Sequence, residues 1–212
     1  MKKSTILSTI GLSVIVVTLG FIFLAPRNTA PVESDEPTTR EDYLRLAERG
    51  NPAAQYMMAV ELLTAENPSK EDVSEGIKWL VKAAHGNDAD AQFNLGAMYA
   101  EGTHRPFVAK NIGDAIKWYH LAAENNHVEA QVNLALIYYY GVDGTPRNYE
   151  EAVKWFERAA DQGDPKAQYL LGDCLYIGRG TKKDKTSAIE LYRKSAQQGF
   201  AEASERLQSI RP

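Results

Sequence analysis

Residues 90–126 read DAQFNLGAMYAEGTHRPFVAKNIGDAIKWYHLAAENN, and this stretch decides the fold because its markers recur along the chain. The pair Ala-Gln returns at intervals of 37, 39 and 37 residues, at Ala54-Gln55, Ala91-Gln92, Ala130-Gln131 and Ala167-Gln168. The pair Lys-Trp keeps the same phase, at Lys78-Trp79, Lys117-Trp118 and Lys154-Trp155. The pair Ala-Ala falls eight residues ahead of the next Ala-Gln, at Ala83-Ala84, Ala122-Ala123 and Ala159-Ala160. Three markers in one phase predict a structural repeat of about 37 residues.

Each unit contains two stretches whose apolar residues have helical spacing. In the first stretch the pattern is Ala-x3-Leu-x3-Tyr, as in Ala91, Leu95 and Tyr99. In the second stretch alanines and aromatic residues keep one phase, as in Ala115 and Trp118. Both patterns place the apolar side chains on one face of a helix with 3.6 residues per turn. The sequence therefore predicts an all-α fold, an α-solenoid of helix–turn–helix repeats.

Small residues mark the close contacts and the ends of these helices. One follows the leucine position of each first helix, at Ala59, Gly96, Ala135 and Gly172. Glycine inside a helix costs about 1 kcal/mol relative to alanine, so we expect a neighbouring helix to pack very close there. Residues that tolerate a left-handed backbone follow the second helices, at Gly50, Asn87, Asn126, Gly163 and Gly199. Glycines also end three of the first helices, at Gly102, Gly141 and Gly178.

The repeat domain is predicted to span residues 40–212, with four complete units between two half-units. Residues 43–47 match only a second helix, and residues 203–210 match only a first helix, so the array contains about ten helices with capped ends. The first complete unit departs from the pattern. Ala65 stands where the other units have a loop glycine, Gly76 replaces an alanine of the second helix, and the loop is expected at Glu66–Ser74.

Residues 1–25 have the composition of a membrane anchor. Lys2 and Lys3 precede an uncharged stretch, Ser4–Ala25. As a helix, its apolar part at residues 6–24 would be ~28 Å long, close to the ~30 Å of a bilayer's hydrocarbon core. Secretory signal peptides have shorter apolar regions and a small-x-small cleavage site, whereas proline follows both candidate cleavage sites here. We therefore expect an uncleaved transmembrane helix, with a cleaved signal peptide as the alternative.

Residues 26–39 are rich in Pro, Thr, Glu and Asp, which is typical of an extended linker. The two N-terminal lysines predict that the short N-terminus stays in the cytoplasm. The repeat domain would then lie outside the cytoplasm, in the periplasm of a Gram-negative bacterium. If the N-terminal segment were cleaved, the domain would be secreted or periplasmic.

Charge and motifs argue against several classes of function. The formal net charge is −4, whereas nucleic-acid binding needs a basic face. Cys174 is the only cysteine, which excludes an intramolecular disulfide, and the four histidines show no metal-ligand spacing. We find no motif of a hydrolase, a phosphate-binding loop or a dinucleotide-binding loop. We therefore expect no catalytic residue, no cofactor, no metal and no small-molecule substrate.

The repeat residues resemble the Sel-one-like repeat family, a branch of the tetratricopeptide-type α-solenoids. The family pattern, A-x-A-Q-x-x-L-G-x-x-Y-x-x-G, a variable loop, then A-x-x-W-Y-x-x-A-A-x-x-G, is matched best at residues 90–126 and 129–163. Members of this family act as adaptors and scaffolds that assemble protein complexes, often at membranes. Some bacterial members are immunity proteins against secreted toxins. The resemblance therefore implies that this chain binds a protein or peptide partner.

Four residues are our candidates for contact with that partner. Asn94 and Asn133 hold the same place on successive first helices, where the family's groove asparagines lie, although they could instead bond within their own repeat. Tyr139 and Tyr140 are adjacent and cannot both face inward, so at least one should be accessible, and tyrosine is enriched at binding hot spots. The three tryptophans recur at one helical phase, which is typical of packing residues.

The sequence thus predicts a membrane-anchored adaptor or scaffold that presents a helical-repeat surface to a protein or peptide. One alternative is an immunity protein that neutralises a single secreted toxin. An alternative of another class is an envelope hydrolase, which would require polar residues that converge in a closed pocket.

Overall fold

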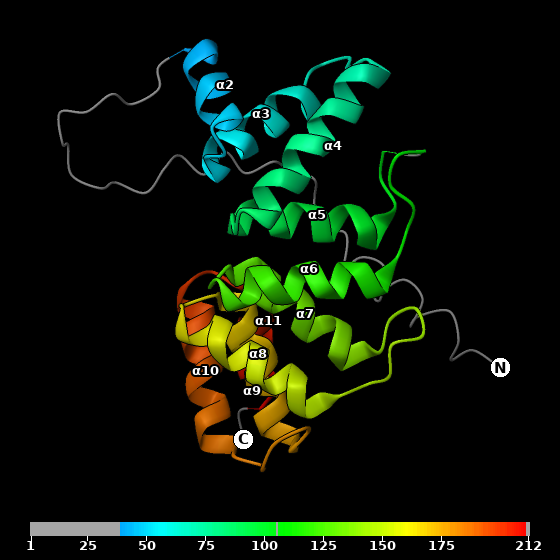
Figure 1. Ribbon diagram of the computed structural model, residues 1–212. Helices are drawn as coiled ribbons and strands as arrows, with labels where there is room; N and C mark the ends of the chain where they lie inside the picture. Colours follow the sequence, from blue (N-terminus) through cyan, green and yellow to red (C-terminus); the bar gives the residue numbers. More distant parts are fainter. Residues whose placement is uncertain (1–38, 105, 211–212) are drawn as a thin grey trace. The chain divides into compact units, whose positions relative to one another are not determined.

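The computed structural model describes residues 39–104 and 106–210, and within them the chain forms ten helices and no strand. The two half-repeats are α2 (Arg40–Glu48) and α11 (Ala201–Ser209). The first helices of the four repeats are α3 (Pro52–Leu63), α5 (Ala89–Glu101), α7 (Val128–Tyr140) and α9 (Pro165–Ile177). The second helices are α4 (Lys70–His85), α6 (Ile112–Glu124), α8 (Tyr149–Asp161) and α10 (Lys185–Gln197). Each helix packs against the helices before and after it in the chain (Figure 1). The predicted all-α solenoid is confirmed.

Every turn from a second helix to the next first helix has three residues, at 49–51, 86–88, 125–127, 162–164 and 198–200. The middle residue of each turn has a positive φ, as the glycine and asparagine positions predicted. In the second turn, Asn87 N–H donates to Ala84 O at 3.2 Å and Asp88 N–H donates to Ala83 O at 3.1 Å. The Ala-Ala marker therefore supplies the carbonyls that close the turn.

The glutamine of the Ala-Gln marker is buried in all four repeats. Each one bonds to the backbone carbonyl of the alanine eight residues earlier. Gln131 Nε2, for example, donates to Ala123 O at 3.0 Å, eight residues earlier. Its Oε1 accepts a hydrogen bond from Gln162 Nε2 at 2.8 Å, just beyond the end of α8. Gln92 and Gln168 make the same two kinds of bond. Each of these glutamines thus joins the C-terminal ends of two successive second helices, which explains the constant spacing of the two markers.

The connections from first to second helices differ in length, with six, ten, eight and seven residues at 64–69, 102–111, 141–148 and 178–184. The last three begin with a glycine in the left-handed conformation, as predicted. They also share a closing bond, for example from Asn148 N–H to Tyr138 O at 2.8 Å. Figure 1 shows the connections at 102–111 and 141–148 extending beyond the helix ends.

The two helix glycines confirm the predicted close approach between helices. A Cβ on Gly96 would lie 2.8 Å from the ring of Tyr119, and a Cβ on Gly172 would lie 2.6 Å from the ring of Tyr192. In the first and third repeats the small residue is Ala59 or Ala135, and the place of the tyrosine is taken by leucine or phenylalanine.

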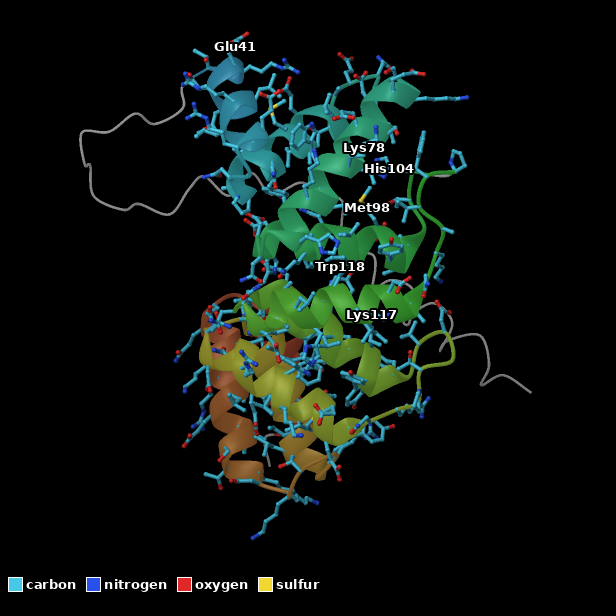
Figure 2. The ribbon with its side chains drawn as sticks, in the orientation of Figure 1. Glu41, Lys78, Met98, His104, Lys117 and Trp118 are labelled. Carbon is cyan, nitrogen blue, oxygen red and sulfur yellow. The ribbon has the colours of Figure 1, made fainter. Side chains whose placement is uncertain are left out.

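The tryptophans pack on the second helices. Trp79 and Trp155 are buried, as expected of packing residues, whereas Trp118 is half-buried against the edge of His85 from α4. Lys117 and Trp118, adjacent in the sequence, leave α6 on different sides (Figure 2). The Lys117 side chain is 75% exposed.

The first repeat departs from the others in three ways. α3 ends at Leu63, and its C-cap Thr64 has a φ of −106° in place of a left-handed glycine. Ser69 and Asp72 form a capping box that starts α4 at Lys70, so the loop predicted at Glu66–Ser74 is wrong at its C-terminal end. Gly76 packs tightly against Leu62 and Leu63.

Within the residues that the structure describes, no helix combines the length and the apolar character needed to cross a membrane. The anchor predicted at residues 1–25 and residues 26–38 of the predicted linker lie outside these residues. Thr39 is the N-cap of α2, where its hydroxyl accepts a hydrogen bond from Asp42 N–H.

Candidate binding surface

The connections between first and second helices line one border of the array, which we call the loop edge, because the two helices of a hairpin run in opposite directions (Figure 1). The three-residue turns line the other border. Residues at the loop edge come from connections of variable length and sequence. This edge is therefore where one repeat differs most from the next.

Two adjacent tyrosines at the end of α7 form the centre of an aromatic cluster at the loop edge. The ring of Tyr139 lies edge-on to Tyr140, with centroids 5.0 Å apart, and edge-on to Tyr149 of α8, at 5.3 Å. Tyr139 and Tyr140 are both half-buried, so both keep solvent-accessible surface. Burial raises the pKa of each hydroxyl above its usual value, and both hydroxyls are therefore protonated at neutral pH.

Arg179 lies over two of these rings. Its guanidinium carbon is 5.4 Å from the ring centre of Tyr139 and 5.3 Å from that of Tyr149, within the range of a cation–π contact. One guanidinium N–H donates to the Tyr139 hydroxyl. The side chain is exposed, and no carboxylate among residues 39–104 and 106–210 forms an ion pair with it. We call the surface of Tyr139, Tyr140, Tyr149 and Arg179 the Tyr–Arg corner.

The backbone of the last connection fixes Arg179 in this position. Gly178 and Gly180, on either side of it, have φ of 78° and 71°. A Cβ on Gly180 would collide with the carbonyl of Tyr149, so only glycine lets the loop rest on the start of α8. Arg179 N–H also donates to Cys174 O at 2.9 Å, which ties the loop to α9.

Further basic residues lie near the corner in the sequence and in the fold. Lys182 and Lys183 are exposed in the same connection as Arg179. Arg147, from the preceding connection, donates from Nε to Tyr140 O at 3.0 Å. The acidic residue of the last connection, Asp184, accepts hydrogen bonds from Thr186 and Ser187 N–H as the N-cap of α10. The last connection thus carries three basic residues and one acidic residue, while Asp173 of α9 lies close enough to Tyr140 to add to the effect of burial in raising the pKa of its hydroxyl.

The predicted asparagines lie away from the corner and join successive repeats. Asn94 Nδ2 donates to the Tyr56 hydroxyl at 2.7 Å, and burial raises the pKa of Tyr56 to about 12. The Asn133 side chain lies beside that of Tyr119 from the preceding repeat, where burial raises the pKa of the tyrosine. Both asparagines are half-buried. Asn133 lies two turns before Tyr140 on α7, ~10 Å along the helix.

Among residues 39–104 and 106–210, no group of three or more His, Cys, Asp and Glu side chains could hold a metal ion. Cys174 is buried, and burial raises the pKa of its thiol to about 12, so the reactive thiolate is scarce at neutral pH. His127 Nδ1 accepts a hydrogen bond from Ala130 N–H at 3.2 Å and caps α7.

Arg179 and Tyr149 are the members of the corner that the sequence patterns did not single out. The one signal for Arg179 is its place between two glycines in a connection that also carries Lys182 and Lys183. Tyr149 is the first residue of its helix, outside the repeated aromatic pattern. Neither position recurs in the other repeats.

A family model described as Sel1 repeat matches residues 52–88, 89–127, 128–164 and 165–200. The chain is also similar to the crystal structure of a Sel1 repeat protein from Oxalobacter formigenes, with 33% identity, a TM-score of 0.69, and coverage of 81% of this chain and 68% of that chain. A second crystal structure is c5321, described as a protective antigen with an SLR fold present in uropathogenic Escherichia coli strains. It has 34% identity and a TM-score of 0.67 over 81% of this chain, but only 36% of its own length is covered.

A more distant similarity is to an immunity protein of Pseudomonas aeruginosa, with 20% identity, a TM-score of 0.45, and coverage of 77% of this chain and 59% of that chain. A similarity this distant carries no argument about the partner of this chain. The comparison with curated proteins gives no match.

Proposed function

The chain belongs to the Sel1 repeat family, and we propose that it is a membrane-anchored scaffold that binds a protein or peptide partner at the loop edge of its third and fourth repeats. The observation that carries this proposal is the Tyr–Arg corner. It offers aromatic surface and free N–H donors on a rigid support, which is the composition of a protein-binding hot spot.

Rigidity of the support matters because ordering a flexible surface opposes binding. Arg179 is held by two rings, one hydroxyl and a loop that rests on α8. The glutamine bonds between second helices hold the repeats themselves in register. A partner would therefore meet a surface that is already formed.

The two asparagines extend the proposed surface along the first helices. Asn94 uses one amide N–H to bond Tyr56, so its carbonyl oxygen and second N–H are open to a ligand's backbone. Asn133 lies on the same helix as Tyr139 and Tyr140. A peptide that contacts the corner and continues along α7 would reach it.

Membrane attachment through residues 4–25 is a separate part of the proposal and rests on the sequence alone. Extraction of cell membranes with alkaline carbonate tests it, because an integral anchor resists this treatment. Release of the chain would favour a cleaved segment.

Photo-crosslinking in the native membrane tests the binding function. A photoreactive amino acid at Tyr140 should capture a partner protein, because this residue lies in the corner. The matched control is Leu121, an exposed apolar residue near the end of α6 at the opposite border. Equal capture from both positions, or none from Tyr140, would contradict the proposed surface.

The same experiment separates the alternatives. A single partner captured at high yield, and encoded beside this chain, would favour an immunity protein. An envelope hydrolase would instead turn over ester, peptide or β-lactam substrates. Turnover that disappears when one polar residue is replaced would overturn the scaffold proposal.

A further inference from the structure

Arg179 is an exposed cation that forms no ion pair with any carboxylate of residues 39–104 and 106–210. Among the described arginines, Arg40 pairs with Glu61 at 2.6 Å and Arg206 with Asp173 at 3.0 Å, whereas Arg147 and Arg158, like Arg179, form no ion pair with the described residues. Arg179 has aromatic faces beside it instead. A guanidinium has five N–H donors, and the described residues accept a hydrogen bond from Arg179 side-chain nitrogen only at the Tyr139 hydroxyl.

The Tyr139 hydroxyl adds a second kind of donor. Because its oxygen accepts from Arg179, its own hydrogen is free to donate to a ligand atom nearby. A carboxylate has two acceptor oxygens in one plane, and a planar guanidinium matches that geometry with two parallel N–H bonds. The corner therefore presents the donors that a carboxylate requires.

Resting on the proposed function, we infer that the Tyr–Arg corner recognises an acidic peptide segment of the partner, with one carboxylate on Arg179 and apolar contact on Tyr140. Lys182 and Lys183 lie three and four residues beyond Arg179 and would attract neighbouring carboxylates of the same segment. The partner class is a protein with exposed glutamate or aspartate in an extended stretch.

The charge of the rest of the domain favours a short acidic segment over a polyanion. Residues 39–210 contain 20 Lys and Arg against 25 Asp and Glu. A nucleic acid or an anionic membrane would bring many negative charges close to this acidic surface, and would be repelled outside the corner. A peptide with a few carboxylates can be confined to the corner itself.

Fluorescence anisotropy with the full-length chain in mild detergent tests this inference. The probe is a fluorescein-labelled peptide with six consecutive glutamates, and the reference is the same peptide with six glutamines. We expect the glutamate peptide to bind at least ~10-fold more tightly, and its affinity to fall as salt is raised. Equal binding of the two peptides would overturn the inference.

Variants locate the binding. Arg179→Gln should weaken the glutamate peptide by ~10-fold or more, and Arg179→Lys should restore only part of the affinity, because lysine lacks the planar pair of donors. The matched control is Arg193→Gln, which removes one positive charge from an exposed position on α10. Equal losses at Arg179 and Arg193 would indicate unspecific charge attraction and overturn the proposal.

Two competitors test whether the corner binds a nucleic acid or an anionic membrane instead of an acidic peptide. A twelve-residue oligothymidylate or vesicles with one third phosphatidylserine should displace the peptide poorly. If either bound more tightly than the peptide and depended on Arg179, the site would be one for nucleic acid or lipid. If photo-crosslinking from Tyr140 still captured a partner in the Arg179→Gln background, the scaffold function would stand and the acidic-segment inference would fall.

Discussion

The first and fourth repeats share one sequence pattern, yet they are held together differently. In the fourth repeat, Gln168 bonds to the end of α8 and accepts a hydrogen bond from Gln198 at the end of α10. In the first repeat, Gln55 donates to Ala47 O, but Gly86 stands where the second bonding partner would be. A side chain at Gly86 would collide with Pro52, so that bond is replaced by close packing.

The connections between the first and second helices of these two repeats also begin and close differently. The first connection, residues 64–69, starts without a left-handed glycine and ends in the capping box of Ser69. The fourth is closed by Asp184 N–H on Leu175 O at 2.9 Å and carries Arg179 between two glycines. The comparison teaches that side-chain hydrogen bonds between second helices hold the later repeats in register, and that Arg179 lies in a connection closed by backbone bonds.

The buried glutamines give the largest expected effect. Gln131→Met keeps the volume but removes two hydrogen bonds, one to Ala123 O, which still accepts from Asn126 N–H, and one from the Gln162 amide, so we expect a loss of about 2–3 kcal/mol in the free energy of unfolding. Gln55→Met removes only the bond to Ala47 O, which still accepts from Gly50 N–H, and we expect about 1 kcal/mol. Urea unfolding followed by circular dichroism measures both. Equal losses would show that the second bond contributes nothing.

Substitution of a helix glycine should give the second-largest change in the free energy of unfolding. Gly172→Ala gains helix propensity, but its methyl group overlaps the ring of Tyr192, which is buried and donates to Asp173 at 2.7 Å. We expect a net loss of about 1–2 kcal/mol. The double variant Gly172→Ala with Tyr192→Leu has the alanine and leucine of the first repeat at these positions. In it, the added methyl group should cost less stability than in the single variant Gly172→Ala.

Gly113→Ala is the control for that experiment. This glycine is exposed near the start of α6, and the nearest contact of an added Cβ would be Asn111 Oδ1 at 3.3 Å. The substitution should raise stability by a few tenths to ~1 kcal/mol. If Gly172→Ala also raised stability, close packing could not be the reason for the glycine.

The residues just beyond the second helices give the smallest effect. Asn125→Ala removes the bonds to Asn87 and Gln92 and should lower thermal stability by about 1 kcal/mol. Arg49→Ala, at the same place after α2, makes no side-chain hydrogen bond to the described residues and should change stability by less than ~0.5 kcal/mol. A larger effect at Arg49 would contradict the role of these bonds.

The repeat could be predicted from the sequence because its markers report local bonds. Ala84 and Gln92 are eight residues apart and meet across one turn, so a fixed spacing in the chain corresponds to a fixed geometry. The glycine stops and the close approach at Gly96 could be predicted for the same reason. The start of α4 could not be predicted in this way. Ser69 N–H bonds to the Asp72 side chain within the cap, whereas the corresponding N–H of the other repeats bonds to a carbonyl of the first helix.

The candidate site was predicted only in part. Tyr139 and Tyr140 are visible as a departure from the repeat, but Arg179 reaches Tyr139 from forty residues away, through a connection whose length varies between repeats. Such a contact leaves no periodic trace. The sequence allows Asn94 to bond either a ligand or its own repeat, and the structure shows a bond to Tyr56 in the preceding repeat.

The constant three-residue turns have a consequence for how such a protein can change. An insertion at that border would separate a glutamine from its carbonyl and shift every later repeat. The opposite border tolerates six to ten residues between helices without disturbing the stack. New contacts can therefore be gained at the loop edge without disturbing the stack, while the three-residue turns preserve its architecture.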